Sequence, residues 1–150
     1  MKTFSRRLGR RLPVVAAAIC LCLPAYADVG QIKVATGQVF VDRKGQSLPG
    51  RVGLALETDD VLRTGADGSV GITMRDNSLL SAGPNSILTL ERFEFDATTS
   101  EGRFDARLQR GTLSVVSGRI AKKSPQAMTV RTPSAVLGVR GTEFVVAVDD

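Results

Sequence analysis

Two arginines stand next to glycine and threonine and could hold an anion: Arg63 in "DDVLRTG" and Arg140 in "GVRGTEF". A guanidinium presents a planar fork of N–H donors that fits a carboxylate or a phosphate. The same fork can instead pair with Asp59, Asp60 or Glu143 and lock a turn, and this structural pairing is the favoured interpretation. The candidates for ligand binding or turn locking are Arg63, Thr64, Gly65, Gly138, Arg140, Gly141 and Thr142.

The first 27 residues predict a cleavable signal peptide. Five basic residues without an acid precede an apolar run from Val14 to Leu23, and Ala25-Tyr26-Ala27 is a small-x-small cleavage signal. That apolar run is too short to span a bilayer. We therefore expect a mature protein of 123 residues (150 − 27) in the periplasm of a Gram-negative bacterium, or secreted, and soluble after cleavage.

Removing the signal peptide changes the charge of the chain. The whole sequence has 20 Lys and Arg against 15 Asp and Glu, and the signal peptide holds five of the basic residues, which leaves 15 against 15. A neutral mature protein gives no support to nucleic-acid binding, which needs a lasting basic patch.

The residue inventory excludes most catalytic chemistry. The chain has no His, and both Cys residues lie in the predicted signal peptide. Zinc sites of the usual kind and Ser-His-Asp or Cys-His arrangements are therefore excluded from the mature part. Calcium at Asp67 and Asp76 would have too few oxygen ligands. We predict no catalytic residue, no metal and no cofactor, and the expected class is not an enzyme.

The elements that must position the arginines read as β throughout. Three units share one design of a turn residue, Gly or Asn, Ser and an aliphatic residue: Asp67 to Val70, Asp76 to Leu79, and Pro84 to Ile87. Gly and Asn tolerate the positive φ that tight turns need. This spacing predicts an all-β fold, a twisted β-solenoid-like or meander sheet built of short strands with Gly/Asn turns, in a single domain over residues 28–150.

Two segments read as exposed loops, and one as the closing strand. The polar stretches Glu94 to Gly102 and Arg119 to Ala127 are the expected loops. Thr132-Pro133 breaks a strand, and Gly138 and Gly141 permit a tight turn before a last strand. That strand includes "FVVAV", which is apolar on both faces, so it is either a buried central strand or an edge that pairs with a partner.

Four motifs in this order resemble the FecR domain family. They are "GQVFV" near the start, Leu56 to Gly68 with its "D-x-L-x-T-G" centre, the "DNSLL" unit from Asp76, and "TPSAVLGVRGTEF" from Thr132 to Phe144. The resemblance covers about Val34 to Val148. It implies an all-β, solenoid-like domain in the periplasm. The regulators that gave the family its name relay ferric-siderophore uptake signals to a cytoplasmic sigma factor, whereas this chain is similar to freestanding exported members.

Three functions follow as expectations. The leading one is an exported, non-enzymatic interaction module of the cell envelope that takes part in signal sensing and binds a protein or envelope component by β-augmentation. The second is a sensor for a small anion or glycan that uses Arg63 and Arg140. The third is a carboxylate-dependent enzyme that cleaves glycans.

Overall fold

A computed structural model describes residues 28–139 and 143–149, and the predicted signal peptide lies outside the described residues. The described chain is almost entirely β, which confirms the predicted class. Within these residues, no helix has the length and apolar character needed to cross a membrane. The strands are β1 (Gly30–Thr36), β2 (Val39–Arg43), β3 (Gln46–Pro49), β4 (Ala55–Leu56), β5 (Val61–Thr64), β6 (Ser69–Met74), β7 (Leu79–Ala82), β8 (Ile87–Phe95), β9 (Gly102–Val116), β10 (Met128–Arg131), β11 (Val136–Gly138) and β12 (Glu143–Val148); the helices are α1 (Arg119–Lys123) and a 3-10 turn, η1 (Pro125–Ala127).

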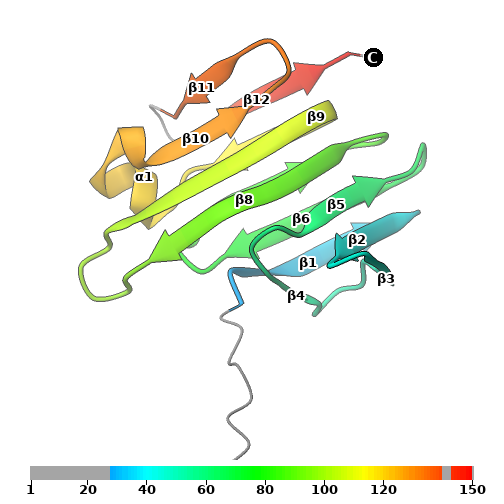
Figure 1. Cartoon of the computed structure of the whole chain (residues 1–150), viewed down its shortest axis with the longest axis horizontal. Coiled ribbons are helices and arrows are strands. Elements are labelled where there is room, and N and C mark those ends of the chain that lie inside the picture. The colour runs from blue at the N-terminus through cyan, green and yellow to red at the C-terminus, as the bar shows by residue number, and fades with distance from the viewer. Residues whose placement is uncertain (1–27, 140–142, 150) are drawn as a thin grey trace, which may run out of the picture.

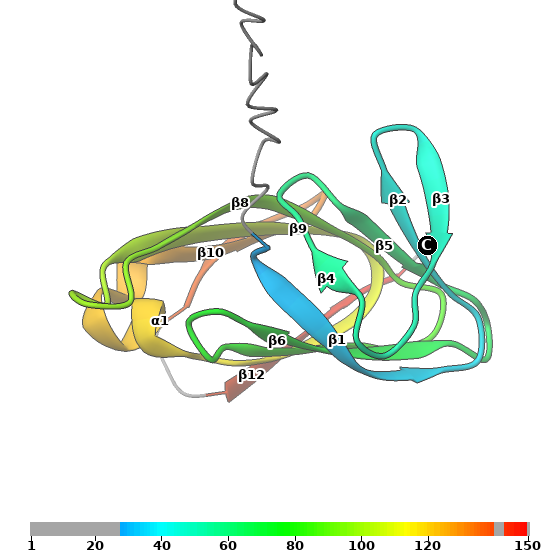
Figure 2. The same ribbon diagram turned by 90° about the horizontal axis from the view of Figure 1, so that it is seen from below.

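The strands form one curled sheet whose two halves face each other, as Figure 1 and Figure 2 show. The half that ends in β12 has the strand order β4-β1-β6-β7-β9-β12, and we call it the β12 layer. The other half has the order β3-β2-β5-β8-β9-β10-β11, and we call it the β11 layer. All pairs are antiparallel except β9 with β10, and β9 belongs to both layers.

The long strand β9 changes layer at Gly111. This glycine has φ +88, and a Cβ built on it would lie 2.2 Å from Ser86 Oγ. Only glycine fits a corner with both constraints. Figure 2 shows β9 running along one layer and returning along the other.

Alternation of side chains builds the core between the layers. In β6 every second residue is buried, and Val70, Ile72 and Met74 are at most 2% exposed. Phe104 from β9 is fully buried and packs edge-on against Phe93 at 5.6 Å between ring centroids. One face of each layer is thereby removed from water, and the other stays available for contacts.

The predicted turns are present, but they do not stack into solenoid coils. Asn77 and Asn85 adopt φ of 65° and 53°, as the turn chemistry predicted. The turn at Asn77 joins β6 to β7 as an antiparallel hairpin, whereas the turn at Asn85 carries the chain from the β12 layer to the β11 layer. The three turn units, which begin nine and eight residues apart, therefore correspond to a hairpin and to crossings between the layers of a curled sheet.

The expected loop from Arg119 to Ala127 is instead helical, and this prediction is wrong. Helix α1 has only five residues, too few for a 3.6-residue period to be visible, and it buries Ile120 and Ala121. The side chain of Asp76, between β6 and β7, caps this helix. Its fully buried carboxylate accepts a hydrogen bond from Ile120 N at 3.2 Å. The same carboxylate accepts from Ser78 N and Ser78 Oγ at 3.0 and 2.8 Å.

The buried Asp76 is therefore used by the fold, as its assignment to a turn predicted. Its bonds join the β6–β7 hairpin to the start of α1. Among the described residues, no group of three or more His, Cys, Asp or Glu residues is placed to hold a metal ion.

Candidate functional site

Arg63 lies on the outer face of the β11 layer, and its guanidinium group is already paired with a carboxylate of the protein. Its Nε and Nη2 donate to the two carboxylate oxygens of Asp42 at 2.5 and 3.0 Å. The guanidinium also lies 5.7 Å from the ring centroid of Phe40. The sequence had suggested Asp59, Asp60 or Glu143 as acceptors, but the antiparallel register of β2 with β5 brings Asp42 next to Arg63 instead.

This pair predicts a dependence of stability on pH. The hydrogen bond from Arg63, with a second from Ser47, lowers the pKa of Asp42 below its usual 3.8. A carboxyl whose pKa is lower in the folded state stabilises the protein above its unfolded pKa, and this contribution is lost as the pH falls through the folded value. Asp42→Asn should therefore lower the free energy of unfolding at pH 7 by at most about 1 kcal/mol, because the pair is largely exposed.

The measurement is urea denaturation of the wild type and of Asp42→Asn between pH 7 and pH 2. The difference between the two proteins should shrink once the pH falls below the usual Asp value of 3.8. A difference that stays constant down to pH 2 would show that the Asp42 carboxylate does not carry the interaction.

Thr64 and Gly65 hold two turns together. Thr64 Oγ1 donates to Gly83 O at 2.6 Å and accepts from Ser86 N at 2.9 Å. Gly65 N donates to Gln38 O at 2.9 Å, and Gly65 O accepts from Asn85 N at 3.0 Å. The polar groups of both residues are thus used inside the protein.

The remaining sequence candidates, Gly138, Arg140, Gly141 and Thr142, precede β12 in the sequence. Gly138 is the last residue of β11 and is opposite Thr129 of β10. Arg140, Gly141 and Thr142 lie outside the described residues. The proposed fork of Arg63 with Arg140 therefore stays a prediction, and an anion at Arg63 would have to displace Asp42.

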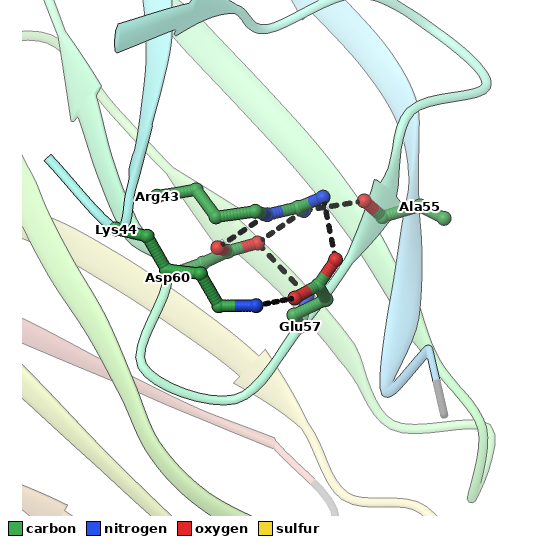
Figure 3. A network of polar contacts seen from close by, with 5 residues as sticks. All are labelled: Arg43, Lys44, Ala55, Glu57 and Asp60. Carbon is green, nitrogen blue, oxygen red and sulfur yellow. Dashed lines mark hydrogen bonds and ion pairs between the residues drawn. The ribbon is translucent and has the colours of Figure 1, made fainter. Parts of the chain in front are cut away.

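A charged cluster lies at the end of the β2–β5 strand pair, and the sequence pattern did not predict it. Asp60 is fully buried and accepts from Arg43 Nε and Nη2 at 2.8 and 2.6 Å and from Glu57 N at 2.8 Å. Arg43 also donates to Ala55 O at 2.7 Å and pairs with Glu57 at 2.9 Å, while Lys44 reaches the same Glu57 at 3.3 Å. Figure 3 shows these side chains converging on one another, so the cluster holds the chain around β4 to the β2–β3 hairpin.

The strand β12 has one paired edge and one free edge. It pairs with β9 through all six residues and with no other strand in residues 28–139 and 143–149. This resolves the alternative left by the sequence: "FVVAV" belongs to an edge strand and not to a central one. Val146 faces the core and is 8% exposed, whereas Val145 faces outward and is 65% exposed.

The backbone groups at the free edge can be assigned by alternation. The N–H of Thr112 in β9 donates to Ser86 Oγ, and its C=O accepts from Gly83 N. Both backbone groups of Thr112 therefore lie on the side of β9 that faces β7. The N–H and C=O groups of successive residues point alternately to the two sides of a strand. Those of Leu113 therefore point toward β12, where Val146 is the residue opposite. The N–H and C=O of Val145 therefore point away from the sheet.

Three other strands at the ends of the sheet are short or end in proline, and β12 is neither. β4 has two residues, β11 has three, and β3 ends in Pro49. Short strands and proline are the usual protections of a sheet edge. β12 runs for six residues, "EFVVAV", without Lys, Pro or Gly.

A groove runs between the ends of the two layers. It has a volume of about 330 Å³ and is lined by Val139 and by residues of β11 and β12, namely Leu137, Gly138, Glu143, Phe144, Val145 and Val146. Figure 1 shows β11 and β12 at the same end of the molecule. The groove, whose side chains are mainly apolar, and the free backbone edge thus lie side by side, an arrangement that suits an extended peptide segment.

Comparison with known proteins gives one match. No curated protein and no solved structure matches the chain. The family model described as FecR protein matches residues 60–150, a range that begins at the buried Asp60 and includes β12. More than half of the chain is covered, and the range contains "DNSLL" and "TPSAVLGVRGTEF", two of the four motifs that pointed to the same family. This protein is a member of the FecR family, which is associated with signalling at the bacterial cell envelope.

Proposed function

We propose that this protein is an exported, non-enzymatic interaction module of the bacterial envelope that receives a strand from a protein partner at the free edge of β12. Residues 1–27 act as the signal peptide, and residues 28–150 form the interaction domain in the periplasm. The observation that carries the proposal is the six-residue free edge of β12 beside a groove with mainly apolar side chains. Such an edge in an exported protein is a template for pairing with another chain.

The mechanism is β-augmentation. The outward N–H and C=O groups of Glu143, Val145 and Ala147 supply backbone hydrogen bonds, which give affinity with little dependence on sequence. Alternate side chains of the incoming strand point inward beside Phe144 and Val146, so they must be apolar. The partner segment is therefore an extended stretch with apolar residues at every second position.

A proline substitution at Val145 tests this mechanism. The N–H of Val145 faces away from β9, and an edge strand tolerates proline where its N–H faces solvent. Proline at Val146 would instead remove a bond to β9, so Val145 is the sharper position. We expect immobilised wild-type protein to retain a partner from a periplasmic extract, and Val145→Pro to lose it with little change in the melting temperature.

Val145→Thr is the matched control, because threonine is also β-branched and keeps the N–H. It should retain the partner. Equal capture by Val145→Pro and Val145→Thr would contradict strand addition at this edge.

A further inference from the structure

We propose that a second copy of this chain occupies the β12 edge when no other strand does, with the two β12 strands antiparallel about a twofold axis at Val145. This inference rests on the proposed function, because it assigns an occupant to the same edge. It follows from three observations: the direction of the free backbone groups of β12, the acidic residues Glu143 at its start and Asp149 just after its end, and the groove beside it.

The free backbone groups of β12 are complementary to themselves. Glu143, Val145 and Ala147 direct N–H and C=O outward, as the alternation from Thr112 requires. In an antiparallel pair of two identical strands, Val145 then exchanges both hydrogen bonds with Val145 of the second copy. Glu143 and Ala147 do the same with each other across the axis, so the interface is isologous.

Glu143 at the start of β12 and Asp149 just after its end select this register. An axis at Val146 would pair more residues, but it would place Glu143 opposite Asp149 of the second copy twice. Like charges directly opposite each other destabilise a strand pair. An axis at Val145 places Glu143 opposite Ala147 and brings the two exposed Val145 side chains together. The second register avoids the repulsion and covers the exposed Val145 side chain.

The groove is covered in the same arrangement. A twofold axis perpendicular to the β12 layer keeps the core side of both copies on the same side of the joined sheet. The groove of about 330 Å³, with Phe144 and Val146 on its β12 wall and Leu137 on its β11 wall, then faces the groove of the second copy. A second copy and a foreign strand would compete for the edge, so self-pairing would protect it in the absence of a partner.

Sedimentation of the protein purified from cells that express the full chain tests the proposal. We expect a reversible monomer–dimer equilibrium at micromolar to sub-millimolar concentration. Val145→Lys places two ammonium groups at the axis and should weaken the dimer by on the order of tenfold or more. Val34→Lys is the control, because Val34 is 56% exposed on the same layer but lies on β1, away from the edge.

Disulfide trapping fixes the register. Cα atoms of a hydrogen-bonded antiparallel pair lie about 5.5 Å apart, within the range of a disulfide. In a chain with Cys20 and Cys22 replaced by serine, Val145→Cys should form a covalent dimer under mild oxidation, and Val34→Cys should not. A protein that stays monomeric, or a dimer that Val145→Lys leaves intact, overturns the proposal.

These outcomes are separate from those of the proposed function. A monomeric protein that captures an envelope partner and loses it on Val145→Pro contradicts the second copy alone. A dimer that dissociates on Val145→Lys, in a protein that captures no partner, contradicts the proposed function alone.

Discussion

Asp60→Asn should lower the free energy of unfolding by about 3–5 kcal/mol, the cost of breaking a buried ion pair by removing one partner. The carboxylate is fully buried and accepts three hydrogen bonds, two from Arg43 and one from the backbone of Glu57. An asparagine turns an NH₂ donor toward one of these donors and leaves the half-buried guanidinium without its closest anion. The measurement is the urea midpoint at pH 7 followed by circular dichroism.

The adjacent acid provides a matched control. Asp59 is exposed and has φ 69, a conformation that asparagine adopts as readily as aspartate. Asp59→Asn should therefore change the free energy of unfolding by no more than about 0.5 kcal/mol. Equal midpoints for Asp59→Asn and Asp60→Asn would mean that the Arg43–Asp60 pair does not hold the β2–β3 hairpin in place.

Gly111→Ala is the second large effect expected. The substitution meets two penalties, because φ is +88 and the new Cβ would lie 2.2 Å from Ser86 Oγ and 2.5 Å from Ser86 Cα. The left-handed backbone costs about 1–2 kcal/mol and overpacking about 1–3 kcal/mol, so the sum is about 2–5 kcal/mol. The corner at which β9 changes layer should open, and the thermal midpoint should fall accordingly.

Gly53→Ala separates the two penalties. Gly53 has φ +92 but open space where a Cβ would be. Gly53→Ala should lower the free energy of unfolding only by the cost of the left-handed backbone, about 1–2 kcal/mol. The same loss in Gly53→Ala and Gly111→Ala would show that contact with Ser86 does not constrain the corner.

Local chemistry was enough to predict the class and several elements. The turns at Asn77 and Asn85 take positive φ, as the turn units predicted, and "FVVAV" lies in strand β12. The bend in β9 was not predictable, since Gly111 interrupts a run that continues as strand on both sides. Helix α1 depends on a cap from Asp76, 44 residues before Ile120, which no local window contains.

The site was predictable only in part, for the same reason. The composition of "FVVAV" predicts a strand. Whether that strand lies at an edge of the sheet depends on which strands pair with β9. The partner of Asp60 likewise lies 17 residues away in Arg43, and that contact is set by sheet register. Sequence pattern gives the strands, and tertiary pairing decides which of them stays open.

Residue-resolved amide exchange on β12, in dilute free protein and in the complex recovered from the periplasmic extract, tests the central claim most directly. In the free protein the Val146 amide, which is bonded to β9, should exchange slowly, while the outward Val145 amide exchanges fast. Binding should slow Val145 and Ala147 strongly and leave Val146 slow. If Val145 exchanges equally fast in the free and the bound protein, no strand is added at the β12 edge.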